Sequence, residues 1–323
     1  DLSSFGVGRV SSLFVYPMSF DEFLTATGQE GLLRTKRNSS PTNPLPEAFY
    51  NRLVEAFRSY MLVGGMPEAV ATYTETGSYR YSSDIVNEII QGYQDDFAKY
   101  GAKANPLLLR QTLISVAHQA GAKFVYSRVE GQYRSAEVKV ALEMLKDAGL
   151  IIPTYHTDAN GVPLGAEINE RVVKYLIHDT GVLLGILGID DDIDDSIKEM
   201  MVADSIDLVD KGHVAEMMAG LELIKYSSPQ KRHQLYYWQN MNKGTCAEVD
   251  YVIARSGSIV PIEVKSGVKG SMSSMYSLMR NPQKHIETGI RCSLENFGTF
   301  ESPDGKKIDI IPLYAISNLF AEK

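Results

Sequence analysis

Two strand-like segments joined by a two-residue turn constrain the fold of this chain more than any other feature. The segments are AEVDYVIAR and SIVPIEVKS, both rich in β-forming residues, and a Ser-Gly pair at 256–257 separates them. An antiparallel hairpin with this turn places Asp250 opposite Glu263. The same register places Glu248 opposite Lys265. Because residues two apart on a strand share a face, the four charges project on one side and the intervening apolar residues face a core.

Directly opposed carboxylates need a positive group between them, since they repel each other by about 0.2–1 kcal/mol on an exposed sheet and by more when buried. Mg²⁺ fits Asp250 and Glu263 because one or two carboxylates hold it together with water and substrate phosphate. Lys265, two positions after Glu263, would reach a phosphate or an attacking water. The alternative is an exposed strand face with a Glu248–Lys265 ion pair and no metal.

The composition is that of a globular protein. The chain has 323 residues, of which 44% are hydrophobic and 22% charged, so disorder, collagen and coiled coil are excluded as the main architecture. The length predicts about two or three domains. The longest apolar stretch is too short to span a membrane. The two cysteines, Cys246 and Cys292, cannot form a disulfide framework. We therefore expect a cytoplasmic protein without a membrane partner.

Four units are expected along the chain, and together they predict an α/β protein (α+β overall). Residues 1–43 carry a strand at 10–16 and a helix capped by Ser19 and Glu22, the tail of a domain with a linker. Residues 44–105 form a helical segment that breaks at Gly64-Gly65. Residues 106–170 form the third unit. Residues 171–323 combine helices with strong β runs, which is typical of a mixed-sheet α/β domain.

The third unit has the order of a winged helix-turn-helix. Helices at 106–119 and 135–150 precede a hairpin of strands 151–156 and 162–168. In such a unit Arg134 and Lys139 would contact DNA from the recognition helix, capped by Ser135, and Arg128 would contact phosphate. Glu137 and Glu143 on the same helix would oppose DNA. Winged helices also serve as packing or protein-contact modules, so both interpretations stay open.

Charge argues against a protein that coats nucleic acid non-specifically, because the net charge is −8. Much of the acidic excess lies in residues 189–210. The ordinary interpretation of this stretch is a solvated loop with a short helix. A calcium loop or a DNA mimic would be the alternative, but the spacing lacks the Gly and closing Glu of an EF-hand.

Several motifs resemble a known family. Asp250 followed by Glu263-Val264-Lys265 resembles the PD-(D/E)XK nuclease superfamily, which usually adds a Glu from a preceding helix, here Glu216. The segments VGRVSSLFVYPMSFDEFL, GGMPEAV, YLIHDTGVL, GHVAEMM, LYYW, AEVDYVI, PIEVKSG and IIPLYAISNL are together similar to prokaryotic AAA-class ATPases. In that family a P-loop domain precedes a winged helix and a C-terminal domain of unknown function with a nuclease-like fold.

The resemblance implies a restriction-endonuclease-like domain at 171–323 that hydrolyses phosphodiester bonds of DNA with Mg²⁺. Asp250, Glu263 and Glu216 would be the metal ligands, Lys265 would orient the nucleophile, and Glu216 would complete the catalytic set. The alternatives are a DNA-binding module that does not cleave and a protein-interaction platform that regulates or assembles the ATPase as a homo-oligomer.

No G-x-x-x-x-G-K-[ST] motif occurs in the sequence, so ATPase activity is not expected from this chain. ATP would bind only through the P-loop domain of the resembling family, which would precede Asp1. The start at Asp1 rather than Met indicates a fragment of a longer chain. Arg9 would sense nucleotide phosphate or be an ordinary surface arginine.

Overall fold

Helices make up the first part of the protein in the computed structural model, which describes residues 11–100, 105–188, 195, 211–240, 247–267 and 270–320. They are α1 (Phe20–Ala26), α2 (Glu30–Arg37), α3 (Glu47–Val63), α4 (Pro67–Thr76) and α5 (Tyr79–Phe97), followed by the 3₁₀ helix η1 (Ala98–Tyr100). As predicted, Ser19 and Glu22 form a capping box at α1. The predicted break is also confirmed, because α3 ends before Gly64 and α4 begins at Pro67.

The strand predicted at residues 10–16 is wrong over its described part, because residues 11–16 form neither strand nor helix. The N–H of Phe14 donates to the carbonyl oxygen of Pro229, and the N–H of Met18 donates to that of Gly65. The segment is therefore tied to two separate loops instead of to one neighbouring strand. The residues of this segment have a high β propensity, but the tertiary contacts override it.

The helix pair and hairpin of the third unit are α6 (Pro106–His118), α7 (Ser135–Asp147), β1 (Ile151–Thr157) and β2 (Ile168–Ile177), with η2 (Tyr126–Arg128) and η3 (Leu164–Glu167) between them. β1 and β2 are antiparallel. The strand predicted at 162–168 is wrong, since residues 164–167 turn as η3 and the second strand begins at Ile168. The expected boundary at 170 consequently falls inside β2, so this strand serves both expected units.

Two sheets meet at Asp250. One has the order β2-β1-β3-β4 and the other β5-β6-β7-β9-β8. Their remaining strands are β3 (Leu235–Gln239), β4 (Glu248–Val249), β5 (Tyr251–Arg255), β6 (Ser258–Val264), β7 (Thr288–Ser293), β8 (Gly298–Glu301) and β9 (Lys307–Pro312). Only Asp250 separates β4 from β5. β6, β7 and β9 are parallel neighbours, so the second sheet is mixed. The α/β class predicted from the sequence is confirmed.

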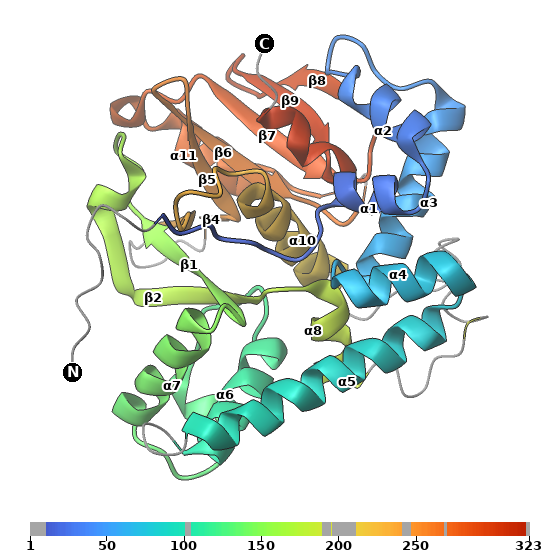
Figure 1. Ribbon diagram of the computed structural model, residues 1–323. Coiled ribbons are helices and arrows are strands. Elements are labelled where there is room, and N and C mark those ends of the chain that lie inside the picture. The colour runs from blue at the N-terminus through green and yellow to red at the C-terminus, as the bar shows by residue number, and fades with distance from the viewer. Residues whose placement is uncertain are drawn as a thin grey trace.

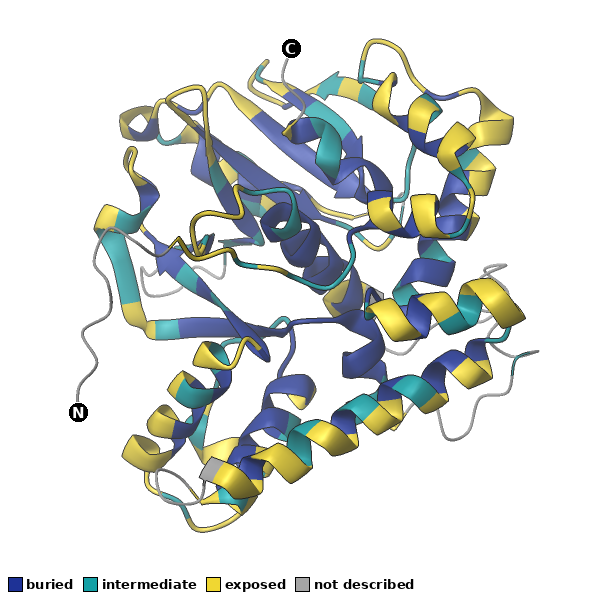
Figure 2. Ribbon diagram, in the orientation of Figure 1, coloured by how far each residue is buried: buried dark blue, intermediate teal, exposed yellow. Residues whose placement is uncertain are grey.

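Helix α10 (Lys211–Lys225) lies where the two sheets join. It contacts β2 and β3 of the first sheet and β6 of the second, and Figure 1 shows it crossing the centre of the molecule. Figure 2 shows this helix as almost entirely buried. The remaining helices are α8 (Thr180–Ile186), α11 (Ser273–Arg280), η4 (Pro282–Lys284) and η5 (Leu313–Leu319). One cluster of buried apolar side chains runs from Phe20 to Leu319, so all four expected units contribute to a shared core.

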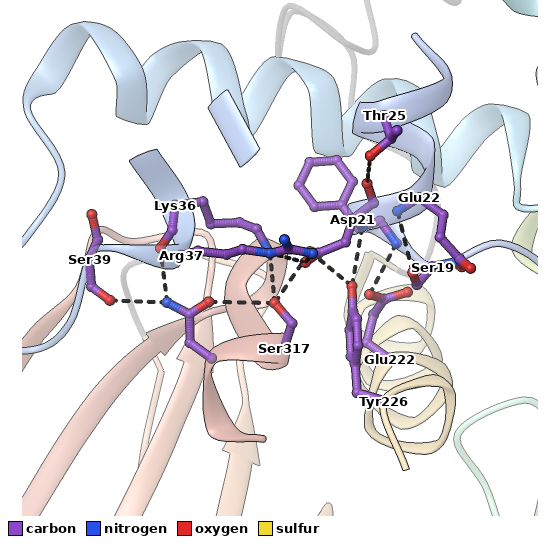
Figure 3. A network of polar contacts seen from close by, with 12 residues as sticks. Ser19, Asp21, Glu22, Thr25, Lys36, Arg37, Ser39, Glu222, Tyr226 and Ser317 are labelled. Carbon is purple, nitrogen blue, oxygen red and sulfur yellow. Dashed lines mark hydrogen bonds and ion pairs between the residues drawn. The ribbon is translucent and has the colours of Figure 1, made fainter. Parts of the chain in front are cut away.

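A buried polar network joins α1 and α2 to α10 and η5, as Figure 3 shows. We call it the α1–α10 network, made of Asp21, Lys36, Arg37, Tyr60, Glu222, Lys225, Tyr226 and Ser317. Lys36 is fully buried and pairs with Asp21. This network links residues about three hundred positions apart, so it holds the N-terminal helices against the C-terminal end of the described chain.

Three features singled out from the sequence fall wholly or largely outside the described residues. They are Arg9, Cys246 and the acidic stretch 189–210, of which only Asp195 is described. Asp195 accepts hydrogen bonds from Ser78 Oγ and from the N–H of Arg80, both at 2.7 Å, at the start of α5. This carboxylate therefore caps a helix. Among the described residues, no helix has both the length and the apolar character to cross a membrane.

Candidate functional site

The predicted hairpin is confirmed with the predicted register over residues 251–262, whereas Glu248 pairs with Gln239 of β3 and does not lie opposite Lys265. Tyr251 pairs with Ile262 and Arg255 with Ser258, around the turn at Ser256-Gly257. The apolar face is buried as expected, with Val249, Tyr251, Ile262 and Val264 in the core. The opposite face of this hairpin carries Asp250, Glu263 and Lys265 at the junction of the two sheets.

Asp250 is held by the strand that faces it. It lies between β4 and β5, so the ladder with β6 begins one residue later, at Tyr251. The N–H of Val264 donates to Asp250 Oδ2 at 2.7 Å. The backbone of β6 next to Glu263 therefore holds the Asp250 side chain in place.

Glu263 pairs with Lys265, two positions along the chain. Lys265 Nζ lies 2.7 Å from Glu263 Oε1. Glu263 is 5% exposed, and its Oε2 has no hydrogen-bond partner among the described residues. The backbone N–H of Lys265 donates to the carbonyl oxygen of Cys292 at 2.7 Å, which fixes the end of β6 against β7. The side chain of Lys265 is 21% exposed, so its ammonium lies where the site meets solvent.

Glu216 comes from α10 and faces the same junction. Its charge and that of Asp250 influence each other, and Tyr251 OH donates to the Glu216 carbonyl oxygen at 2.8 Å. The structure thus brings together Glu216, Asp250, Glu263 and Lys265 from three separate parts of the fold. This convergence is what the sequence motifs predicted.

Lys174 is the residue that sequence reasoning missed. It lies on β2, is 1% exposed, and its Nζ lies 2.8 Å from Glu216 Oε1 and 2.6 Å from Glu248 Oε1. Its ammonium also lies 5.0 Å from the ring centroid of Tyr237. The Glu248–Lys265 pair expected as the alternative is therefore replaced by Glu248–Lys174 and Glu263–Lys265. The signal in the sequence was a lysine inside the apolar run VVKYLI, because a buried lysine needs partners.

Negative charge exceeds positive charge in this group of side chains. We call it the carboxylate cluster, made of Glu216, Glu248, Asp250 and Glu263 with Lys174 and Lys265. Four carboxylates face two ammonium groups. A buried surplus of this kind disfavours the ionised carboxylates.

Burial is the largest cause of the raised carboxyl pKa values, and neighbouring negative charges add to it. Burial, with the charges of Asp250 and Glu248, raises the pKa of Glu216 to about 8 against the opposing effect of Lys174. Burial and the charge of Asp250 raise the pKa of Glu263 to about 7. Burial also raises the pKa of Asp250, although the N–H of Val264 opposes it. Burial works to lower the pKa of Lys174, yet Glu216 and Glu248 hold it above its ordinary value.

The donor chemistry of the cluster fits a hard divalent cation. Its donors are carboxylate oxygens, which Mg²⁺ prefers, and the buried Glu263 Oε2 lacks a partner within the described chain. Across the described residues, however, no group of three or more His, Cys, Asp or Glu side chains is arranged to hold a metal ion. Lys174 engages both Glu216 and Glu248. Asp250 and Glu263 are the carboxylates left for a cation.

A loop of the third unit covers Glu216. Gly121 has a φ of +74°, and a Cβ there would lie 2.7 Å from His213 Cδ2 and 3.2 Å from Glu216 Oε2. A larger residue would therefore displace either the exposed His213 side chain or the loop itself. The third unit contributes to the cluster through this loop, and Lys174 reaches it from β2, beyond the expected boundary at 170.

The three predicted DNA contacts lie apart from this cluster in the fold. Arg128, Arg134 and Lys139 are all exposed on η2 and α7. Figure 1 places α7 below β1 and β2, whereas β5 and β6 lie above them. The N-cap of α7 is Arg134, not the predicted Ser135, and Glu137 Oε2 accepts the N–H of Arg134 at 2.8 Å. Glu137 therefore caps the helix. This structural role explains the presence of one of the two acidic residues that would oppose DNA.

Comparisons with known proteins find two domains in the chain. Residues 54–193 match a domain of unknown function, DUF8612, and residues 211–316 match another, DUF4143. The second is found with N-terminal AAA-type ATPase domains. No curated protein and no solved structure matches the chain. Lys174 belongs to the first matched region and the four predicted site residues to the second, so the cluster is built across both.

Proposed function

We propose that this chain is the C-terminal part of an AAA-class ATPase and that its nuclease-like domain hydrolyses phosphodiester bonds of DNA with Mg²⁺. The convergence of Glu216, Asp250, Glu263 and Lys265 at one junction of two sheets carries the proposal. The charge surplus and the buried Glu263 Oε2, which has no partner within the described part of the chain, support it, because both would be relieved by a divalent cation.

Each residue of the cluster has a role in this proposal. Bound Mg²⁺ would supply a Lewis acid that activates water and withdraws charge from the phosphate. Asp250 and Glu263 would hold it, with Asp250 kept in place by the N–H of Val264. Lys265, partly exposed beside Glu263, would orient the attacking water and neutralise charge that develops on the phosphate.

The ATPase part of the proposal rests on the sequence resemblance and on the second matched domain. The chain has no P-loop motif, so ATP would bind in a separate P-loop domain of the full-length protein. The ATPase domain would be a partner within the same full-length chain. Copies of that chain would assemble into a ring or a dimer, which this C-terminal part would regulate.

A second candidate function is a non-catalytic module that binds DNA or protein and regulates the ATPase. The exposed residues of α7 and its N-cap favour a protein partner. Basic Arg134 and Lys139 are interspersed with acidic Glu137 and Glu143. Val140 is 49% exposed. Mixed charge with an exposed apolar residue suits a protein surface better than phosphate. Salt-dependent DNA affinity that Arg134→Ala and Lys139→Ala reduce would favour DNA instead.

The direct test is DNA cleavage with Mg²⁺ or Mn²⁺ against a chelator control. The Asp250→Ala, Glu263→Ala double variant should lose cleavage by about a thousandfold or more, because both ligands of the cation are gone. Glu287→Gln, which removes an exposed carboxylate outside the cluster, should cleave as the parent does. Cleavage that persists in the double variant would refute the proposal.

A further inference from the structure

Lys174 contacts the carboxylate cluster from outside the nuclease-like motif. It lies on β2, opposite Thr154 of β1, and forms an isolated bridge with Lys123. Its side chain is 2% exposed, so the ammonium is removed from bulk water. The backbone of β2 thus delivers a positive charge into the junction of the two sheets.

The surroundings of this ammonium resemble those of a bound cation. Two carboxylate oxygens from different elements, Glu216 Oε1 of α10 and Glu248 Oε1 of β4, lie at 2.8 and 2.6 Å. The Tyr237 ring lies on another side, with its centroid 5.0 Å from Nζ. Opposite charge at these distances fixes both carboxylates and offsets their repulsion.

The same contacts divide the cluster into two halves. Glu216 and Glu248 are joined by Lys174, whereas Asp250 is joined to β6 and Glu263 to Lys265. Glu263 Oε2, in the second half, is a buried carboxylate oxygen without a partner among the described residues. The second half therefore offers a cation a buried acceptor.

We propose that Lys174 is a positioning residue whose ammonium group takes the place of one metal ion in the cluster. Its ammonium occupies the position between Glu216 and Glu248, so a single divalent ion binds through Asp250 and Glu263. This inference rests on the proposed metal-dependent function and refines it, because it removes Glu216 from the metal ligands and assigns it to Lys174.

The test measures Mn²⁺ stoichiometry by calorimetry, without any activity readout. The parent chain should bind one Mn²⁺, lost in Glu263→Gln, which removes a ligand, and kept within about twofold in Glu216→Gln, which does not. Lys174→Met should bind a second Mn²⁺ that Glu216→Gln removes again. Lys174→Arg, which keeps the charge, should bind one.

The outcomes separate this inference from the proposed function. One Mn²⁺ in both parent and Lys174→Met, or a tenfold weaker affinity in Glu216→Gln alone, would overturn the role of Lys174 while leaving a metal-dependent nuclease intact. Mn²⁺ binding in Lys174→Met but not in the parent would keep the role of Lys174 and refute the metal site of the parent. If Lys174→Met does not fold, the Glu216→Gln affinity decides the question in an otherwise unchanged chain.

Discussion

Helix α10 carries two buried carboxylates that belong to opposite kinds of polar cluster. Glu222 lies in the α1–α10 network and Glu216 in the carboxylate cluster. Both are almost inaccessible to solvent, at 2% and 8% exposure. Burial alone therefore does not distinguish them, and the difference lies in how completely each is neutralised.

In the α1–α10 network every charge has a partner. Asp21 is bonded by Lys36, Arg37, Tyr226 and Ser317, as Figure 3 shows. Burial works to raise the pKa of Asp21, but Lys36 holds it below its ordinary value. A fully paired network of this kind stabilises one arrangement of the chain.

In the carboxylate cluster the pKa values move the other way, since those of Glu216, Asp250 and Glu263 are all raised. Selection for stability alone would not retain four carboxylates around two ammonium groups. The comparison shows that surplus charge, rather than burial alone, distinguishes the carboxylate cluster, where we propose the functional site.

The largest expected effect separates the two clusters by stability. Lys36→Met should lower the free energy of unfolding by about 3–5 kcal/mol, because it leaves Asp21 buried without its main partner. Lys265→Met should cost about 1 kcal/mol or less, because Glu263, with a pKa of about 7, can take up a proton instead. Urea unfolding at neutral pH measures both. Equal losses would contradict the distinction between a paired network and a cluster with surplus charge.

The next effect tests the cover over the carboxylate cluster. Gly121→Ala should destabilise by about 2–3 kcal/mol, through its positive φ and through the clash with His213 and Glu216. Gly149→Ala is the matched control, because Gly149 has a φ of +78° but nothing within 4 Å of the added Cβ. It should lose about 1 kcal/mol, measured by the same unfolding experiment. If both variants lose the same amount, the loop at Gly121 does not press on α10.

The residues of the carboxylate cluster illustrate where sequence reasoning ends. The hairpin register followed from a two-residue turn, which fixes Asp250, Glu263 and Lys265 locally. Glu216 was found because its motif precedes the hairpin. Lys174 comes from a distant strand, and no local pattern specifies which distant side chains meet.

The wrong strand at 10–16 has the same cause. Its residues have a high β propensity, but strands need a neighbour, and the contacts of Phe14 and Met18 go to loops. The strand predicted at 162–168 likewise gave way to η3, and β2, which carries Lys174, begins only at Ile168. The core and the motif were thus predictable, whereas the long-range partners were not.

A third effect appears in the pH dependence of stability. Glu216 and Glu263 have pKa values of about 8 and about 7 in the folded protein, above the value of about 4.3 in an unfolded chain. The folded state therefore binds more protons, and stability falls as the pH rises from about 5 to about 9. Asp21, with a lowered pKa, contributes equally across this window.

The control for this pH dependence is the Glu216→Gln, Glu263→Gln double variant, whose unfolding free energy should change less between about pH 5 and about pH 9. Unfolding curves at several pH values measure it. A slope that survives in the double variant would place the responsible groups outside the carboxylate cluster.

The smallest effect tests a single bond of the α1–α10 network. Tyr226 OH donates to Asp21 Oδ1 at 3.0 Å and accepts the N–H of Asp21 at 3.1 Å. Tyr226→Phe should lower the free energy of unfolding by about 1 kcal/mol, because the other partners of Asp21 remain while its N–H loses its acceptor. Tyr236→Phe, whose hydroxyl bonds Gln234 at the surface, should change it by less than about 0.5 kcal/mol. A loss in Tyr226→Phe as large as that in Lys36→Met would mean that the hydroxyl, rather than the ammonium, organises Asp21.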